Sequence, residues 1–309
     1  MTGERTTYLL AGSLVTLALQ LAAGLLGPLG LMFNLVVAVP AAYAGMRQGA
    51  AVAAGIVALT SAVLVLVGGP GGAFAYLLQF GLASWLLPFL LRRGWSWGKA
   101  LVTSLLAVCG ASGATLVGYS LLQGTAVGLL VAGYVQGEID RALGIYTEAG
   151  ISGEQLAELE VLTRQMADFL LQAWPALAVV AIGALLLLLL LLLWAFSSGR
   201  YEIPGPALRQ WKVPENFIWP LIAGGAGIVL GGDWVQRIAL NLLVLVLPIY
   251  FLQGLAIVQH YFWKRNTSPF LRRLGYVLIA VLNPLPLIVT GLGVFDMWID
   301  FRKPRIKKS

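Results

Sequence analysis

Residues 184–196 read ALLLLLLLLLWAF, with nine consecutive leucines from Leu185 to Leu193. A helix with leucine at every position has no polar face, so it cannot rest on a soluble core with one side in water. The apolar interval around the run extends from about residue 172 to residue 196, which is long enough to cross a hydrocarbon layer of ~30 Å. The run therefore predicts a helix that spans a membrane and meets lipid on most of its sides.

The composition of the whole chain agrees with a protein embedded in lipid. Of its 309 residues 59% are hydrophobic and 11% are charged, and the mean hydropathy is +0.87. A soluble domain carries about 25% charged residues, and a core of this length cannot hide so much apolar surface. The apolar runs are continuous rather than alternating, which excludes membrane β-strands.

We expect an all-α, polytopic integral membrane protein with about eight membrane-spanning helices. Two helical hairpins come first, because two long charge-free intervals are each interrupted by glycine and proline, at residues 27–30 and 68–72. The later spans are expected at about residues 100–122, 172–196, 216–231 and 234–263.

The positive charges predict the orientation of these helices. The formal net charge is +7, but Lys and Arg occur in short blocks between the apolar runs, as at Arg47, Arg92 and Arg200. Such blocks stay on the cytoplasmic side of a membrane, so we read them as topology signals and expect no nucleic-acid partner. Both termini are then expected in the cytoplasm.

The last apolar stretch is expected to be a broken, re-entrant hairpin. Residues 274–300 are interrupted by Asn283-Pro284-Leu285-Pro286, and proline removes a backbone donor and stops a helix. The basic tail after Asp300 belongs in the cytoplasm only if this stretch enters and leaves the membrane on one side. A ninth complete span is the alternative.

The sequence suggests three parts. Residues 1–122 are expected to form a five-helix part, residues 123–171 an acidic extracytoplasmic segment, and residues 172–309 the remaining membrane helices with the basic tail. Apolar residues recur at helical spacing between Leu156 and Leu170, which predicts an amphipathic helix that leads into the leucine-rich span.

Polar side chains inside the predicted spans mark a candidate substrate-binding site, because each is costly in lipid unless it faces a partner or a cavity. Under the predicted orientation they lie in the outer half of the membrane or at its outer surface, so a shared outward-facing pocket is one hypothesis. Separate hydrogen bonds between helices are the alternative. The residues are Gln20, Asn34, Gln79, Tyr119, Asn241 and Arg237.

Small residues on the first span mark a candidate partner interface. Ala11, Ala18 and Ala22 share one face of that helix. Small residues let membrane helices approach closely. Packing inside this chain is the ordinary role of such a face, and docking of a helix from another subunit is the alternative.

No enzymatic activity, metal or cofactor is expected. The one cysteine, Cys109, has no cluster of cysteine or histidine near it. Gly110-Ala111-Ser112-Gly113 matches the Gly-x-Ser-Gly of rhomboid proteases, but Ser112 is predicted near the middle of its span, whereas the single histidine, His260, is predicted near the cytoplasmic surface. A hydrolase needs the two groups within hydrogen-bond reach.

Two carboxylates precede the basic tail. Asp296 and Asp300 are four residues apart, share a helix face, and form a candidate site for a proton or a cation. The alternative is ion pairing with nearby basic side chains. The candidates for that pairing are Arg272, Arg273, Arg302 and Lys303.

The C-terminal part resembles the YybS-like family, a group of bacterial inner-membrane proteins of unknown function. The most specific parts are residues 250–258, which contain Phe-Leu-Gln-Gly-Leu-Ala, and the ending Asp-Met-Trp-Ile-Asp-Phe-Arg at residues 296–302. Residues 211–220 also resemble the family, and the resemblance covers almost the whole chain. It implies a multi-pass protein of the bacterial inner membrane.

The N-terminal part is similar in layout to another group, the S components of energy-coupling-factor vitamin transporters. S components usually have six spans, bind a micronutrient in an outward-facing pocket, and depend on a T subunit and paired ATPases. The similarity covers residues 7–122. It implies a specificity subunit for the uptake of a small molecule, with Ala18 and Ala22 facing a T-like partner. The alternative is a membrane scaffold that holds partner subunits and moves no solute.

Overall fold

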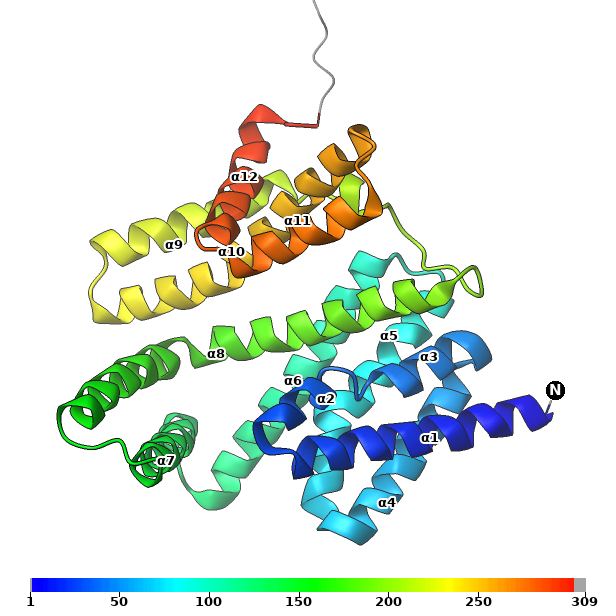
Figure 1. Cartoon of the computed structure of the whole chain (residues 1–309), viewed down its shortest axis with the longest axis horizontal. Helices are drawn as coiled ribbons and strands as arrows, with labels where there is room; N and C mark the ends of the chain where they lie inside the picture. Colours follow the sequence, from blue (N-terminus) through cyan, green and yellow to red (C-terminus); the bar gives the residue numbers. More distant parts are fainter. Residues whose placement is uncertain (1, 303–309) are drawn as a thin grey trace, which may run out of the picture. The chain divides into compact units, whose positions relative to one another are not determined.

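The computed structural model describes residues 2–302, which are helical with short connections and no strand in that range (Figure 1). The chain forms two compact units. The N-terminal unit comprises the chain up to Val127 together with Ala181–Gly205, and the C-terminal unit comprises Gly128–Val180 together with the chain from Pro206 onward. Helix α8 (Glu154–Ser197) runs through both units, so this division differs from the three parts expected from the sequence.

The N-terminal unit is built from apolar helices joined by short turns (Figure 1). Its fourth helix is broken, because Gly69 has φ 77° and ψ 176°, a left-handed conformation that glycine tolerates. The expected break at residues 68–72 is confirmed at that position. The helices are α1 (Thr2–Leu25), α2 (Gly30–Asn34), α3 (Val39–Gln48), α4 (Ala50–Tyr76), α5 (Leu82–Arg92), α6 (Trp97–Gln123) and the end of α8, with a π-helical turn η2 (Leu77–Gly81) before α5.

The described part of the N-terminal unit contains six apolar helical segments when α4 is divided at Gly69 and the end of α8 is included. The sequence predicted five helices there, and the sixth is the leucine-rich end of α8. Four of its leucines, Leu186, Leu189, Leu190 and Leu193, are buried, whereas Leu191 is 42% exposed. The segments are residues 2–25, 30–48, 50–68, 70–92, 97–123 and 181–197.

Glycines bring α1 and α4 together. A Cβ added at Gly12 would lie 2.5 Å from Ile56 Cδ1, and one added at Gly55 would lie 2.9 Å from Leu9 Cδ1, so large side chains of each helix pack against a glycine of the other. Ala11 and Ala18 are exposed and Ala22 is half-buried. The packing of α1 on α4 therefore uses Gly12 rather than the neighbouring Ala11.

The cationic segments of the N-terminal unit meet at one end of it, which we call the basic end. The N-terminus, the end of α3, the connection from α5 to α6 and the segment after α8 are linked there by hydrogen bonds. These segments contain the basic residues that the sequence predicted on one side of the membrane. The bonds are Gln48 Nε2 to Glu4 Oε1 (3.2 Å), Arg92 Nη1 to Met46 O (2.6 Å), Trp97 N to Pro204 O (2.8 Å) and Arg200 Nη1 to the Tyr43 hydroxyl (3.1 Å).

The C-terminal unit contains a helix that the sequence did not predict. Helix α7 (Val127–Glu148) lies in the acidic segment, and α8 continues for 44 residues after it. At about 1.5 Å per residue α8 is roughly twice as long as the membrane core is thick. The expected amphipathic helix is thus the first part of α8. The other helices of this unit are α9 (Ile218–Leu230), α10 (Asp233–Lys264), α11 (Pro269–Val281) and α12 (Leu285–Ile299).

Helix α10 is the centre of the C-terminal unit and contacts both α9 and α12 (Figure 1). A Cβ at Gly227 in α9 would lie 2.7 Å from Ala239 Cβ in α10. A Cβ at Gly254 of α10 would collide with Val289 O, and one at Gly293 of α12 would collide with Tyr250 O. The backbones of α10 and α12 therefore touch where the two glycines lie.

Six helices of the described residues are long and apolar enough to cross a membrane, or seven if the bent pair α11 and α12 counts as one span. The expected number was about eight. The difference arises because residues 50–92 form one long stretch despite the break at Gly69, and because Glu215–Leu230 is short. Helices α11 and α12 meet at 102°, which confirms the expected break near Pro284. A re-entrant path for this pair stays a prediction.

Candidate functional site

The six residues of the expected substrate pocket are divided between the two units. Gln20, Asn34, Gln79 and Tyr119 belong to the N-terminal unit, and Arg237 and Asn241 belong to α10 of the C-terminal unit. The pocket that would unite all six stays a prediction.

In the N-terminal unit the four polar residues differ in burial. Gln79 lies on the π-helical turn and is exposed, and Tyr119 is 53% exposed. Asn34 ends α2 and is half-buried. Gln20 differs from the others, because its Oε1 is buried and has no hydrogen-bond partner among the described residues. Buried polar atoms nearly always have a hydrogen-bond partner, so among these four residues Gln20 is the one that lacks an expected hydrogen bond.

Asn241 and Arg237 form hydrogen bonds with backbone groups of α8 where Pro175 interrupts the hydrogen bonding of that helix. Pro175 lies inside α8 and has no N–H to donate, and Arg237 Nη2 instead donates to Leu171 O (3.1 Å). Asn241 Nδ2 donates to Gln172 O (2.8 Å), and its Oδ1 accepts from Ala176 N (3.1 Å). For these two residues the structure shows the hydrogen bonds between helices that were the alternative to a pocket.

Replacement of Asn241 by leucine should destabilise the C-terminal unit. The variant leaves Gln172 O and Ala176 N without these bonds. Ala176 is buried, and a buried unsatisfied group costs about 1–3 kcal/mol. We expect a clear decrease in the thermal unfolding temperature of the detergent-solubilised protein. Gln236→Leu on the same helix is the matched control, because it removes a single long bond from an exposed side chain. Equal decreases for both variants would refute the role given to Asn241.

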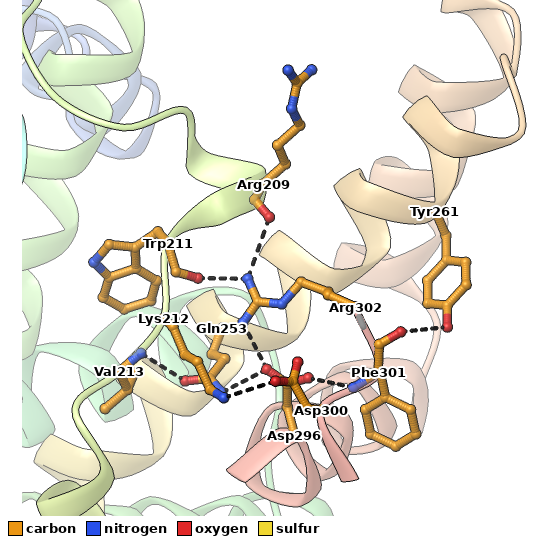
Figure 2. Close-up of polar contacts among 10 residues, drawn as sticks. All are labelled: Arg209, Trp211, Lys212, Val213, Gln253, Tyr261, Asp296, Asp300, Phe301 and Arg302. Carbon is orange, nitrogen blue, oxygen red and sulfur yellow. Dashed lines mark hydrogen bonds and ion pairs between the residues drawn. The ribbon is translucent and has the colours of Figure 1, made fainter. Parts of the chain in front are cut away.

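A buried ionic cluster closes the C-terminal end of α12 (Figure 2). Asp296 is fully buried, and Arg302 Nη2 donates to its Oδ2 at 2.6 Å with 10% of the arginine side chain exposed. Phe301 N donates to Asp296 Oδ1 (2.9 Å), and Gln253 Nε2 donates to Oδ2 (3.0 Å). Both carboxylate oxygens of Asp296 are therefore satisfied by the protein itself.

The same cluster connects the segment before α9 to α10 and to the end of α12. Arg302 Nη1 donates to Trp211 O (2.7 Å) and to Arg209 O (3.3 Å), and Gln253 Oε1 accepts from Val213 N (3.0 Å). Figure 2 shows these bonds converging from three parts of the chain: the segment 209–213, α10 and the end of α12. The cluster thus stabilises their relative arrangement.

The expected ion pairing of the two carboxylates is confirmed for Asp296, whose partner is Arg302. Asp300 instead lies 3.6 Å from Lys212 Nζ, a residue that the sequence did not suggest. Arg272 donates to Thr267 O, and Lys303 lies outside the described residues. Gln253 was also not predicted from the sequence as a partner of Asp296, although Gln253 lies in residues 250–258, a stretch that had been singled out from the sequence.

Removal of the Arg302 guanidinium should be far more damaging than removal of the Asp300 charge. Arg302→Ala leaves the Asp296 carboxylate buried without its counterion, which costs about 3–5 kcal/mol. Asp300→Asn removes the charge from a half-exposed pair with Lys212, worth about 0–1 kcal/mol, and asparagine accepts the left-handed backbone there. Thermal unfolding should rank the two variants in that order. Similar stability of both would mean that the buried cluster contributes little.

The N-terminal unit has a groove at its basic end, which we call the aromatic groove. Its volume is about 460 Å³. The rings of Tyr8, Phe196 and Tyr201 all lie 6.1–6.5 Å from the ring of Tyr43. Burial raises the pKa of Tyr201 to about 12, so its hydroxyl stays protonated and donates to Leu193 O (2.6 Å). The lining residues are Tyr8, Ala11, Gly12, Val15, Val39, Pro40, Tyr43, Ala44, Ala195, Phe196, Ser198 and Arg200.

The expected pocket residues and the aromatic groove do not coincide. None of Gln20, Asn34, Gln79 and Tyr119 is among the groove's lining residues, whereas Ala11, expected at a partner interface, lines it. Ser112 lies in α6 of the N-terminal unit and His260 in α10 of the C-terminal unit. No group of three His, Cys, Asp or Glu side chains that could hold a metal ion occurs within residues 2–302.

Comparison with known proteins gives one match. A family model described as a predicted membrane protein (DUF2232) matches residues 14–297. No curated protein and no solved structure matches the chain. The matched range covers most of both units and includes Asn241, Gln253 and Asp296, and it ends before Arg302.

Proposed function

The chain belongs to this DUF2232 family of predicted membrane proteins, and from that premise we propose that it is an S-component-like specificity subunit for the uptake of a small molecule. It resides in the bacterial inner membrane, has no catalytic activity of its own, and receives energy from other subunits, among them a T-like membrane partner and ATPases.

The observation that carries the proposal is the make-up of the N-terminal unit. S components usually have six spans, and this unit contains six apolar helical segments among the described residues once residues 50–92 are divided at Gly69 and the end of α8 is included. The sequence alone suggested five helices followed by unrelated ones. In this proposal the N-terminal unit corresponds to a whole S component, and the C-terminal unit is an additional part that S components lack.

A buried polar face on α1 supports a ligand inside this unit. Ser13 is 2% exposed and Thr16 is fully buried, and with Gln20 they lie on one face of the helix. Thr16 donates to Gly12 O (2.8 Å), but Ser13 Oγ and Gln20 Oε1 have no hydrogen-bond partner among the described residues. Unpaired polar atoms are costly in an apolar surrounding, and a polar ligand would relieve that cost.

The orientation agrees with uptake from outside. Because lysine and arginine stay on the cytoplasmic side, the basic end of the N-terminal unit faces the cytoplasm. Helix α1 begins at that end and reaches Gln20 about 12 residues later than Tyr8, which is ~18 Å further along the helix. Gln20 is thus in the outer half of the membrane, where an S component binds its micronutrient.

The full-length protein, purified in detergent and denatured, should release a defined small molecule that mass spectrometry identifies. The same molecule, added back, should raise the unfolding temperature, since a ligand at 100 times its Kd stabilises by about 2.7 kcal/mol. Gln20→Leu should abolish the retained molecule. Gln136→Leu, which changes an exposed glutamine on α7 paired with Asp140, should leave it unchanged. Equal retention by both variants would exclude Gln20 from the site.

The second candidate function is a membrane scaffold without transport. The exposed small residues favour it, because Ala11 and Ala18 on α1 and Ala54 and Ala58 on α4 are not used for packing within the N-terminal unit. Small residues at the surface of a membrane helix suit close approach by a partner helix. A protein that releases no small molecule and co-purifies in fixed stoichiometry with another membrane protein would support this function over the first.

A further inference from the structure

The aromatic groove combines an apolar interior with uncompensated positive charge. Val15, Val39 and Pro40 supply aliphatic surface, and Phe196 is 47% exposed. Arg200 lines the groove, and its Nη1 donates to the hydroxyl of Tyr43 (3.1 Å). In the described part of the chain Arg200 forms no ion pair with a carboxylate.

A second cation lies beside the same groove. The guanidinium carbon of Arg47 is 6.0 Å from the centre of the Tyr8 ring, and Tyr8 lines the groove. Arg47 also has no ion pair within residues 2–302. Its Nε is buried with no hydrogen-bond partner there, while the Tyr8 hydroxyl and the Glu4 carboxylate lie near enough to interact with the guanidinium. Glu4 is engaged by another partner, because it accepts from Gln48 Nε2. The positive charge of Arg47 and Arg200 is thus available to an anion.

We propose that the aromatic groove binds one anionic phospholipid from the surrounding bilayer, with an acyl chain against the apolar wall and the headgroup phosphate against Arg200 and Arg47. This site is separate from the proposed uptake site, because the two use different faces of α1. Tyr8, Ala11 and Val15 line the groove, whereas Ser13, Thr16 and Gln20 lie on another face and do not line it.

The chemistry of the groove fits this ligand in three respects. Charge-assisted hydrogen bonds from a guanidinium to phosphate are short and strong. Tyrosine and other aromatic side chains are enriched at the depth of lipid headgroups, which is where Tyr8, Tyr43 and Tyr201 lie if the basic end faces the cytoplasm. Basic pockets between membrane helices on that side bind anionic lipid headgroups. A groove of about 460 Å³ holds part of one lipid and leaves the rest in the bilayer.

The test is a titration of the full-length protein in a neutral detergent with short-chain phosphatidylglycerol, followed by intrinsic fluorescence and by native mass spectrometry. Phosphatidylcholine with the same chains tests the need for negative charge, and inorganic phosphate tests whether the headgroup alone suffices. Arg200→Gln and Arg47→Gln remove the cations. Arg93→Gln is the matched control, because Arg93 is a basic residue of the same unit that stacks on Phe89 (4.3 Å) and does not line the groove.

We expect one phosphatidylglycerol per chain, no saturable binding of phosphatidylcholine, and an apparent affinity about tenfold lower for Arg200→Gln and for Arg47→Gln. Arg93→Gln should bind as the natural sequence does. Ala11→Trp, which fills the groove from an exposed position and keeps both arginines, should abolish binding.

Four results would overturn the proposal. Equal binding of both lipids would show that the arginines do not select the ligand. Equal loss of affinity in Arg200→Gln and Arg93→Gln would show that the lipid responds to the overall surface charge and not to the groove. Competition by inorganic phosphate as strong as that by the lipid would indicate a site for free phosphate. Unchanged binding in Ala11→Trp, with the fold verified by its unfolding temperature, would place the lipid elsewhere.

Discussion

A polar group that is buried away from water is costly unless it forms a hydrogen bond, and within a lipid bilayer its partner must come from the protein or from a bound ligand. The C-terminal unit depends on this constraint at two places. Proline interrupts α8 at residue 175, and Asn241 and Arg237 supply the hydrogen bonds that the helix has lost. At the end of α12 the buried Asp296 receives donors from Arg302, Gln253 and Phe301. Side chains that look like candidates for chemistry are therefore used to complete the fold.

The periodicity and the breaks of the helices were predictable, because they depend on local sequence. The leucine run, the interruption at Gly69 and the bend before Pro284 follow from residue types that act on their own stretch of backbone. The buried cluster was predicted only in part. Arg302 was one of four suggested partners of Asp296, whereas Gln253 and Lys212 were not considered. Pairings over 43 residues, as between Gln253 and Asp296, depend on how helices cross and leave no periodic signal. Helix α7 was missed because its sequence is too polar for a span.

The N-terminal unit places its polar features on different faces of α1. Its basic end contains Arg47 beside the Tyr8 ring and Arg200 bonded to the Tyr43 hydroxyl. Basic and aromatic side chains together are typical of a membrane interface. On another face of the same helix Ser13 and Gln20 present buried oxygen atoms that have no hydrogen-bond partner among the described residues. The first feature suits an anionic lipid and the second suits a polar ligand within the membrane. Of the residues expected in a common pocket, Gln20 is the one whose surroundings in this unit call for a ligand, and Asn241 has a structural role in the other unit.

The central claim is that the basic end of the N-terminal unit faces the cytoplasm. This orientation places Gln20 in the outer half of the membrane and the aromatic groove at the cytoplasmic headgroups, and both proposed sites depend on it. Cysteine labelling in intact cells measures this directly. In a Cys109→Ala background, Trp95→Cys lies between α5 and α6 at the basic end, and Gly71→Cys lies just after the break in α4; both positions are exposed. A membrane-impermeant maleimide should label the Gly71→Cys variant in intact cells and the Trp95→Cys variant only after permeabilisation. Labelling in the reverse pattern would contradict the account.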